Sequence, residues 1–220
     1  TLLEEHSSSF DEISTYHKKK QSWNEKSNQW DEDRWSQNIP DMYESIRDAV
    51  QSAVTAKENK NWEKGITQYT RAISLFQKGS GKINTLQEQV QERWKNLLQE
   101  KMPPAKRTAA QGIAPELWQK FSKQKQKIED HLEANNYQEV QRLVEDTETL
   151  ATEIQDKLAQ AGKQAEEKLA RLRQRMRRFQ QKDNPYRKIW PEKYEKVVSL
   201  FETAEEGKNN DNMGQVNNAA

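Results

Sequence analysis

The sequence predicts an all-α protein, an elongated tandem array of antiparallel helical hairpins with long, coiled-coil-like second helices. Three observations predict this fold class. First, hydrophobic residues make up only 32% of the 220 residues, charged residues another 32%, and the mean hydropathy is −1.24, so the chain can bury narrow stripes between helices but no thick core. Second, seven Trp, six Tyr and five Phe recur at helical spacing, which argues against disorder. Third, proline-led segments recur at one period, as in repeat proteins.

Three prolines mark the repeat. Pro115 lies 75 positions after Pro40, and Pro191 lies 76 positions after Pro115. An acidic residue directly follows each proline, and an aromatic residue stands three positions after the proline. The three segments are Pro40-Asp41-Met42-Tyr43, Pro115-Glu116-Leu117-Trp118 and Pro191-Glu192-Lys193-Tyr194. A second large residue stands 22 positions after each proline, at Trp62, Tyr137 and Met213.

These markers divide the chain into four segments. We expect the tail of a preceding helical repeat in 1–37, a first repeat in 38–111, a second repeat in 112–187, and the first hairpin of a truncated third repeat in 188–220. Because the chain starts inside one unit and stops inside another, we expect it to be a fragment of a longer protein.

Each repeat is expected to begin with a short helix and a tight turn. Residues 1–35 should be the end of an earlier long helix, since their large apolar residues keep helical spacing. The next helix starts at Pro40, because proline fits a first helical turn and an acid behind it faces the positive helix end. It should end near Lys60, where "ENKN" supplies Asn residues that cap helices and tolerate left-handed backbone angles. The later breaks are "EANN" and "GKNNDN".

The second helix of each repeat is expected to be longer. In the first copy it starts at Trp62, breaks at the "KGSGK" stretch of 78–82, and resumes as far as Lys101. In the second copy it spans 137–180, with an apolar stripe stepping by threes and fours through Val140, Val144, Thr147, Leu150, Ile154, Leu158, Ala161, Ala165, Leu169, Leu172, Met176 and Phe179. This spacing is typical of a coiled-coil seam. The stretches "MPPAKRTAAQGIA" and "KDNPYRKIW" are expected to be linkers.

The stretch "NWEKGITQYTRAISL" resembles the second helix of a tetratricopeptide repeat. In that family an aromatic residue opens the helix, a small residue follows, and then come an aromatic and an Ala; Trp62, Gly65, Tyr69 and Ala72 match. The match is best over residues 49–75, and the family repeats every ~34 residues, whereas the period here is about 75. The resemblance implies helical-hairpin geometry and, by analogy, protein interaction.

The charge and the composition of the chain limit the classes of partner that it is expected to bind. The net charge is +1, which indicates neither nucleic acid nor an anionic membrane. No apolar run approaches the ~20 residues of a membrane helix, and the absence of Cys excludes disulfides and thiolate metal sites. We therefore expect a protein partner or neighbouring repeats of the same chain, with oligomerisation possible. The compartment stays open, with the cytoplasm favoured.

The basic run "RLRQRMRR" is the sharpest charge feature. Arg171, Arg175 and Arg178 could bind an acidic partner, phosphate or a nucleic-acid backbone. The competing interpretation is that these arginines lay their stems over the apolar stripe and pair with acids of a neighbouring helix. That interpretation is favoured, because no aromatic platform accompanies the run.

No catalytic, metal-binding or cofactor-binding residue is predicted. The three histidines lack ligand spacing, the acid clusters are expected to be solvated, and "GSGK" lacks the first Gly of a phosphate loop. The tryptophans at the repeat corners, Trp62, Trp118 and Trp190, are expected to pack there. For Trp23, Trp30 and Trp35, both burial and exposure to a partner stay open.

The favoured function is a non-enzymatic structural scaffold or spacer. One alternative is a tetratricopeptide-like interaction module that docks a peptide or helix around Tyr43, Trp62 and Tyr69. Another is an accessory region of a larger enzyme or signalling protein. A third is a stalk that binds acids or nucleic acid through Arg171–Arg178.

Overall fold

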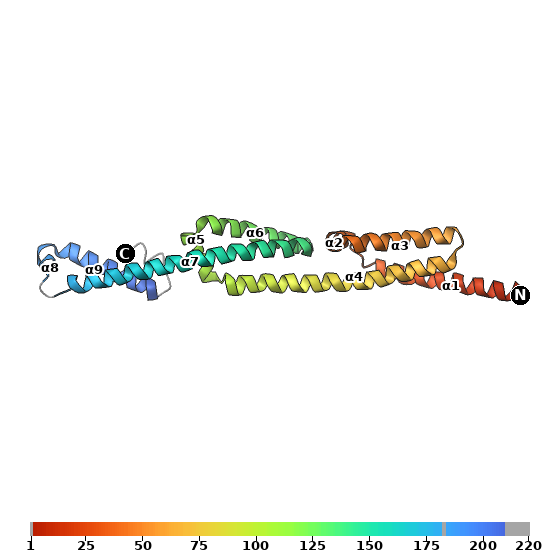
Figure 1. Cartoon of the computed structure of the whole chain (residues 1–220), viewed down its shortest axis with the longest axis horizontal. Helices are drawn as coiled ribbons and strands as arrows, with labels where there is room; N and C mark the ends of the chain where they lie inside the picture. Colours follow the sequence, from red (N-terminus) through yellow and green to blue (C-terminus); the bar gives the residue numbers. More distant parts are fainter. Residues whose placement is uncertain (1, 182–183, 210–220) are drawn as a thin grey trace. The chain divides into compact units, whose positions relative to one another are not determined.

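The computed structural model describes residues 2–181 and 184–209, and every regular element in these ranges is a helix (Figure 1). The all-α prediction is therefore confirmed. The helices are α1 (Leu2–Ser27), α2 (Glu32–Asn38), α3 (Pro40–Glu58), α4 (Trp62–Asn96), the π-helix η1 (Leu97–Lys101), α5 (Pro104–Ile113), α6 (Pro115–Glu133), α7 (Tyr137–Phe179), α8 (Tyr186–Ile189) and α9 (Pro191–Asn209).

The chain forms two compact units. The first comprises Thr1–Arg93 and Lys127–Val144, and the second Trp94–Gln126 and Glu145–Ala220. The first unit holds α1, α2, α3, most of α4 and the α6–α7 turn. The second holds η1, α5, the start of α6, most of α7, α8 and α9.

In the first unit, α1 and α3 both pack against the beginning of α4 (Figure 1). The three helices approach closely at Gly65, where a Cβ would lie 2.7 Å from the ring of Tyr16 in α1 and 3.6 Å from the carbonyl oxygen of Ala53 in α3. Glycine is therefore required for the three helices to meet here. The buried residues of α3 follow helical spacing: Tyr43, Ile46, Ala49, Ala53 and Ala56.

The three repeat prolines occupy the same local setting. Each is the first residue of a 19-residue helix, and each follows a short helix and one non-helical residue, as expected before proline. The non-helical residues are Ile39 (φ −146°, ψ 61°), Ala114 (φ −136°, ψ 59°) and Trp190 (φ −137°, ψ 68°). In all three the backbone N–H donates to the carbonyl oxygen four residues earlier.

The two described turns between short and long helices also share one geometry. Lys60 and Asn135 both adopt left-handed backbone angles, with φ of 54° and 55°, so α3 ends at Glu58, two residues before the predicted end. The next residue then caps the long helix: the Oδ1 of Asn61 accepts from the N–H of Lys64 at 3.0 Å, and the Oδ1 of Asn136 accepts from the N–H of Glu139 at 3.3 Å. The third marker, Asn212-Met213, lies outside the described residues.

The predicted break at "KGSGK" is wrong, because α4 runs without interruption from Trp62 to Asn96. Gly79 has a packing role instead: a Cβ there would lie 2.3 Å from the ring of Trp35 and 2.9 Å from Ile39. Gly81 meets nothing within 4 Å. A helical glycine can mark the close approach of a ring as well as a break.

Two further expectations change. The expected linkers contain helices, since α5 begins at Pro104 in the first helical position and α8 follows Pro185. The expected single N-terminal helix is two helices, because α1 ends at Ser27 and α2 starts after Asp31, whose side chain caps it by accepting from the N–H of Arg34.

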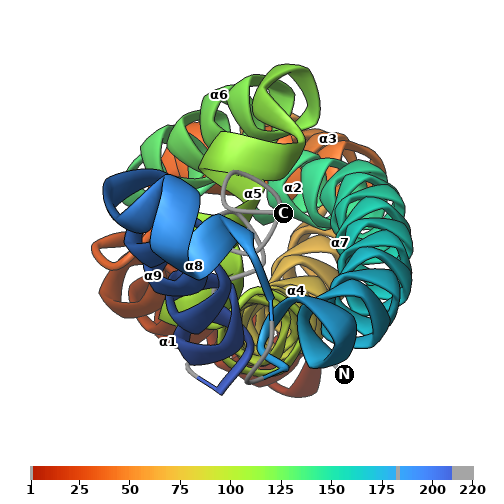
Figure 2. The ribbon, with the colours of Figure 1, turned by 90° about the vertical axis from the view of Figure 1, so that its left-hand side faces the viewer.

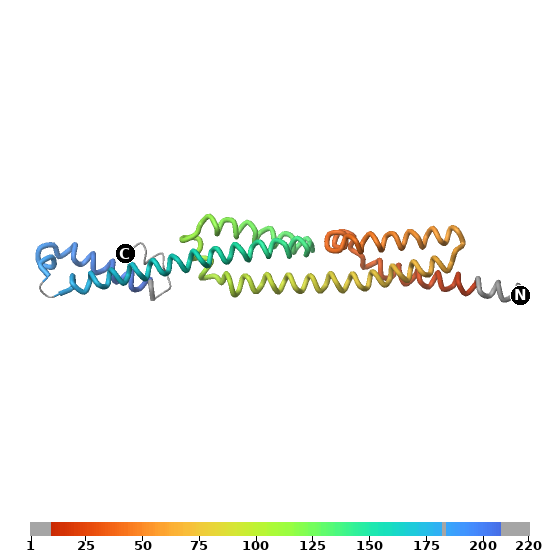
Figure 3. Tube along the Cα trace, viewed as in Figure 1, coloured from red at the N-terminus to blue at the C-terminus, as the bar shows by residue number. Residues whose placement is uncertain are grey.

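In the second unit, the last turns of α7 lie beside α9 (Figure 3). Ala165 and Leu169 of α7 are buried against Ala204 of α9, and the half-buried Leu172 and Phe201 pack around them. An ion pair between Arg173 and Glu205 joins the same helices. Figure 2, which has the side with α8 and α9 nearest the viewer, shows α8 leading into α9.

Candidate functional site

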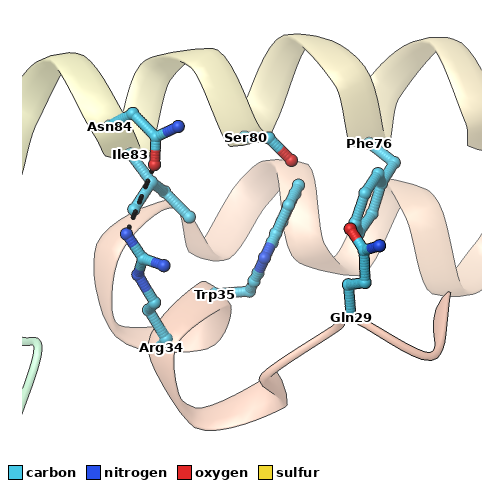
Figure 4. Close-up of a pocket in the computed structure, with 7 residues that line it drawn as sticks. All are labelled: Gln29, Arg34, Trp35, Phe76, Ser80, Ile83 and Asn84. Atoms are coloured by element: carbon cyan, nitrogen blue, oxygen red, sulfur yellow. Dashed lines mark hydrogen bonds between the residues drawn. The ribbon is translucent and has the colours of Figure 1, made fainter. Parts of the chain in front are cut away.

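A small polar pocket lies between α2 and α4 in the first unit (Figure 4). Its volume is about 220 Å³, and it is lined by Gln29, Arg34, Trp35, Phe76, Ser80, Ile83 and Asn84. The indole of Trp35 stacks on Phe76 with 4.8 Å between ring centroids and 13° between planes. The volume is below the roughly 300–1,000 Å³ of small-molecule sites, and the residues around the pocket form a joint between α2 and α4.

Arg34 connects three helices at this joint. Its Nη2 donates to the Oδ1 of Asn84 at 3.4 Å and to the Oε1 of Gln87 at 3.0 Å, both on α4. Its guanidinium carbon lies 5.6 Å from the ring centroid of Tyr137, at the start of α7. The Nε is buried without a hydrogen-bond partner. The positive charge is thus held by amide oxygens and an aromatic face.

Asn38, the last residue of α2, is the most completely bonded side chain of the joint. It is 0% exposed. Its Nδ2 donates to the carbonyl oxygens of Arg34 and Asn135, each at 2.7 Å. Its Oδ1 accepts from the backbone N–H groups of Tyr137 at 2.7 Å and Gln138 at 3.2 Å.

This geometry gives Asn38 two functions. Its oxygen caps the first turn of α7, whose N–H groups have no partner within the helix. Its nitrogen holds the left-handed residue of the α6–α7 turn. The amide of Gln138 donates in return to the backbone carbonyl of Asn38 at 2.7 Å. The end of α2 is therefore bonded to the α6–α7 turn.

Two of the predicted partner-binding residues share an aromatic cluster. Tyr69 is buried and Trp62 is half-buried, and Tyr16 of α1 meets both, with ring centroids 5.4 Å and 5.5 Å away. Burial, followed by the hydrogen bond with Tyr16, raises the pKa of Tyr69 above its ordinary value of 10.0. The two rings are thus part of the contact between α1 and α4.

Tyr43 lies in a separate cluster at the start of α3. Its hydroxyl donates to the Oε2 of Glu32 at 3.0 Å, its ring meets Trp30 edge-on at 5.5 Å, and Arg47 lies over it at 5.6 Å. Burial, then the hydrogen bond with Glu32, raises the pKa of Tyr43. Partner binding at Tyr43, Trp62 and Tyr69 stays a prediction, and a partner there would meet mainly the exposed part of Trp62.

The tryptophans divide by position. Trp23 and Trp35 are buried, and Trp30 is half-buried against Trp23 and Trp35, so the N-terminal tryptophans build the core of the first unit. Among the corner tryptophans, Trp62 and Trp118 are half-buried, whereas Trp190 is exposed.

The basic run lies on α7 and flanks its buried stripe. Arg171, Arg175 and Arg178 are all exposed, while Leu169, two residues before the run, and Met176 within it are buried. Arg171 approaches Glu167 one turn earlier at 4.0 Å. These arginines belong to the second unit, whereas the Tyr43 and Trp62 clusters belong to the first.

The described residues show no grouping of three His, Asp or Glu side chains suited to a metal ion. His17 stacks edge-on against Tyr16, and Asp31 caps α2. The side chain of His6 lies outside the described residues. Within residues 2–181 and 184–209, no helix is long and apolar enough to span a bilayer.

Sequence patterns alone do not reveal Asn38 and Arg34. Asn38 precedes Ile-Pro in a polar stretch, with its partners about 100 positions away. Gly79 carries a signal that could have been used: a glycine inside a helical apolar pattern indicates a close packing partner.

Comparisons of the sequence with models of protein families, with curated proteins and with solved structures find no match.

Proposed function

We propose that this chain is a non-enzymatic scaffold or spacer made of tandem helical repeats, in which the corner of one copy is bonded to the turn of the next. The observation that carries the proposal is the recurrence of one local geometry at Pro40, Pro115 and Pro191, together with left-handed turns at Lys60 and Asn135. Fixed-period units that each bury only a stripe are stabilised by their neighbours.

The polar groups of the α2 joint support the same proposal. Asn38 and Arg34 bond to backbone and amide groups of neighbouring helices, as expected for groups that set the position of one helix on another. The arrangement as an elongated array of hairpins with coiled-coil-like long helices is part of the proposal.

Small-angle X-ray scattering of the chain tests it. A globule of 220 residues has a radius of gyration near ~17 Å, and an array stacked lengthwise has a clearly larger one. A value near that of the globule would refute the scaffold.

A protein-interaction module is the second candidate. The observation that favours it is the group of exposed apolar side chains on α8 and α9, because contiguous apolar surface marks interaction sites in soluble proteins.

A further inference from the structure

Four stacked aromatic rings lie where α7, α8 and α9 meet in the second unit. Phe179, at the end of α7, stacks on Tyr194 of α9 with 4.8 Å between ring centroids and 17° between planes. Phe179 also stacks on Tyr186 of α8, at 6.4 Å and 21°. Tyr186 stacks in turn on Trp190, at 5.7 Å and 14°. We call these four residues the aromatic ladder.

The aromatic ladder is partly open to solvent and has a cation over the ring at each end. Tyr186 is 49% exposed and Trp190 is 51% exposed. The Nζ of Lys193 lies 5.6 Å from the ring centroid of Trp190. The guanidinium carbon of Arg187 lies 5.9 Å from the ring centroid of Tyr194. The ladder therefore offers aromatic surface to a ligand, next to positive charge.

The basic run of α7 leads into this ladder. Arg171, Arg175 and Arg178 are spaced by four and three residues, so they lie on one face of the helix, and Arg175 is one turn before Phe179. Among residues 2–181 and 184–209, Arg175 and Arg178 form no ion pair. Arg171 approaches only Glu167, at 4.0 Å, and both side chains are exposed. Such a pair contributes little, so all three guanidinium groups can bind an anion.

The excess of positive charge is local and comes from α7. From Arg171 to Asn209, at the end of α9, there are eleven basic and six acidic residues, and the rest of the chain has 25 basic and 29 acidic residues. α8 and α9 by themselves are neutral. With the repeat prolines aligned, residues 20–27 and 95–102 each hold two basic residues and one acidic residue, whereas 171–178 hold five basic residues and no acidic one. The helical pattern itself thus does not require these arginines.

Arginines beside exposed aromatic rings match one class of ligand. A single strand of nucleic acid combines phosphates, which bind guanidinium groups, with bases whose faces stack on aromatic side chains. The sequence showed the arginines without an aromatic platform, and the folded chain places Phe179, Tyr186 and Trp190 beside the end of the run. An acidic peptide would use the arginines and leave the rings without a role.

We propose that the end of α7 and the aromatic ladder bind single-stranded nucleic acid. Arg171, Arg175 and Arg178 bind phosphates, and a base stacks on Trp190. Lys193, which lies over that ring in the free chain, then pairs with a phosphate. The site goes beyond the scaffold function and does not depend on it, because every residue of the site lies in the second unit.

The test is a fluorescence-anisotropy titration of the full chain into a labelled oligo(dT) strand of about 15 nucleotides, within the range of known single-strand sites. Saturable binding is expected. Four phosphate contacts, from the three arginines and Lys193, predict that the logarithm of the affinity falls with the logarithm of the salt concentration with a slope of about −3. An oligo(U) strand is run in parallel; saturable binding of either strand supports the proposal, and the tighter one identifies the sugar that the site prefers.

Two variants separate charge from stacking. Arg175→Gln with Arg178→Gln should bind about tenfold or more weakly, and the salt slope should become shallower by about 1.4. Trp190→Ala should also bind about tenfold or more weakly, but with the salt slope unchanged, because it removes a stacked base and no charge. Trp190→Phe should restore part of the affinity. The matched control is Arg47→Gln with Arg71→Gln, which removes two exposed arginines from the first unit and should leave binding unchanged. Circular dichroism checks that all variants keep their helices.

A strand without bases is the matched control for the ligand. An abasic oligonucleotide of the same length keeps the phosphates and should bind about tenfold or more weakly than oligo(dT). The proposal is overturned by absence of saturable binding, by equal binding of the abasic strand, or by wild-type affinity in either the double arginine variant or Trp190→Ala. Displacement of the strand by polyglutamate of equal charge at equal concentration would assign the surface to an acidic protein instead. Binding to phosphatidylserine–phosphatidylcholine vesicles by a chain that does not bind the strand would assign it to an anionic membrane.

Discussion

Replacing Asn38 with alanine removes the amide that bonds α2 to the α6–α7 turn. The wild-type side chain makes four hydrogen bonds, to the carbonyl oxygens of Arg34 and Asn135 and from the N–H groups of Tyr137 and Gln138. Asn38 is fully buried, and its bond to the N–H of Tyr137 lies in a buried setting, so this group loses its partner without gaining bulk water.

The expected loss of stability follows from these bonds. Three of them are 2.7 Å long, and at about 1 kcal/mol for each net bond the free energy of unfolding should fall by about 3 kcal/mol. The fourth bond, at 3.2 Å, shares the same oxygen and adds little. Loss of a helix cap alone costs about 1 kcal/mol. Unfolding free energies can therefore distinguish an Asn38 that joins α2 to the α6–α7 turn from one that only caps α7.

Urea unfolding followed by circular dichroism measures the total loss of stability in Asn38→Ala, and hydrogen exchange shows which helices are affected. The amides of Tyr137 and Gln138 should exchange faster in Asn38→Ala, while amides in α9 should not change. Ser45→Ala is the matched control, because its hydroxyl donates only to the carbonyl of Asp41 within α3 at 2.8 Å. That variant should stay within about 0.5 kcal/mol of the wild type.

Asn38→Asp distinguishes two roles of Asn38, which are joining α2 to the α6–α7 turn and capping the first turn of α7. Aspartate keeps the oxygen that caps α7, and its charge suits a helix N-terminus, but it loses both donors and places charged oxygens beside two carbonyl oxygens. If Asn38 joins the corner to the turn, Asp should destabilise the chain at least as much as Ala. Wild-type stability in Asn38→Asp, or a loss below about 1 kcal/mol in Asn38→Ala, would refute the reasoning.

The remaining predictions concern single positions. Gly79→Ala should destabilise the chain by about 1–3 kcal/mol, because its Cβ would lie 2.3 Å from a tryptophan ring, whereas Gly81→Ala should stabilise it by about 1 kcal/mol; equal effects in urea unfolding would contradict the packing role. Lys60→Gly should stabilise by about 1 kcal/mol, since a left-handed φ of 54° strains a side chain, and an unchanged urea midpoint would argue against that strain. Because the pKa of Tyr69 is raised above 10.0 in the folded chain, its stability contribution is present below that pH and is lost as the pH rises through the folded pKa. Tyr69→Phe should therefore flatten the decline in stability above about pH 10, and an identical decline in both chains would rule out this residue as its source.

Local chemistry could be predicted from the sequence, and distant contacts could not. Proline at a first helical position and Asn at a turn act within a few residues, so the starts of α3, α6 and α9 and the turns at Asn61 and Asn136 follow from the pattern. Gly79 was misjudged because its partner, Trp35, belongs to another helix. Asn38 was missed because it bonds to residues 97 to 100 positions away.

The corner helices were misjudged for a related reason. α5 and α8 lie in stretches with prolines, which indicate linkers when only breakers are counted. Yet Pro104 occupies the first turn of α5, where its missing N–H costs nothing. The rule that proline fits a first helical turn, which located α3 from Pro40, applies to Pro104 as well. The stretch "AKRTAAQGI" was nevertheless taken for a linker because it has too few apolar residues to form a helical stripe.

The polar joint at Asn38 offers a physical reason for the composition of the chain. An apolar stripe repeats every three to four residues, so two helices joined only by such stripes can shift by a turn and still bury similar area. Asn38 bonds only where α2 ends and the α6–α7 turn begins, and a one-turn shift of about 5.4 Å would break every one of its bonds. A buried polar residue can set register in this way. Only 32% of the residues in this chain are hydrophobic. An amide group that fixes the register of two helices does so without any increase in the apolar core. The prediction that Asp at this position is as harmful as Ala tests this idea directly, because Asp preserves the size and the capping oxygen but replaces the two N–H donors with a charged oxygen.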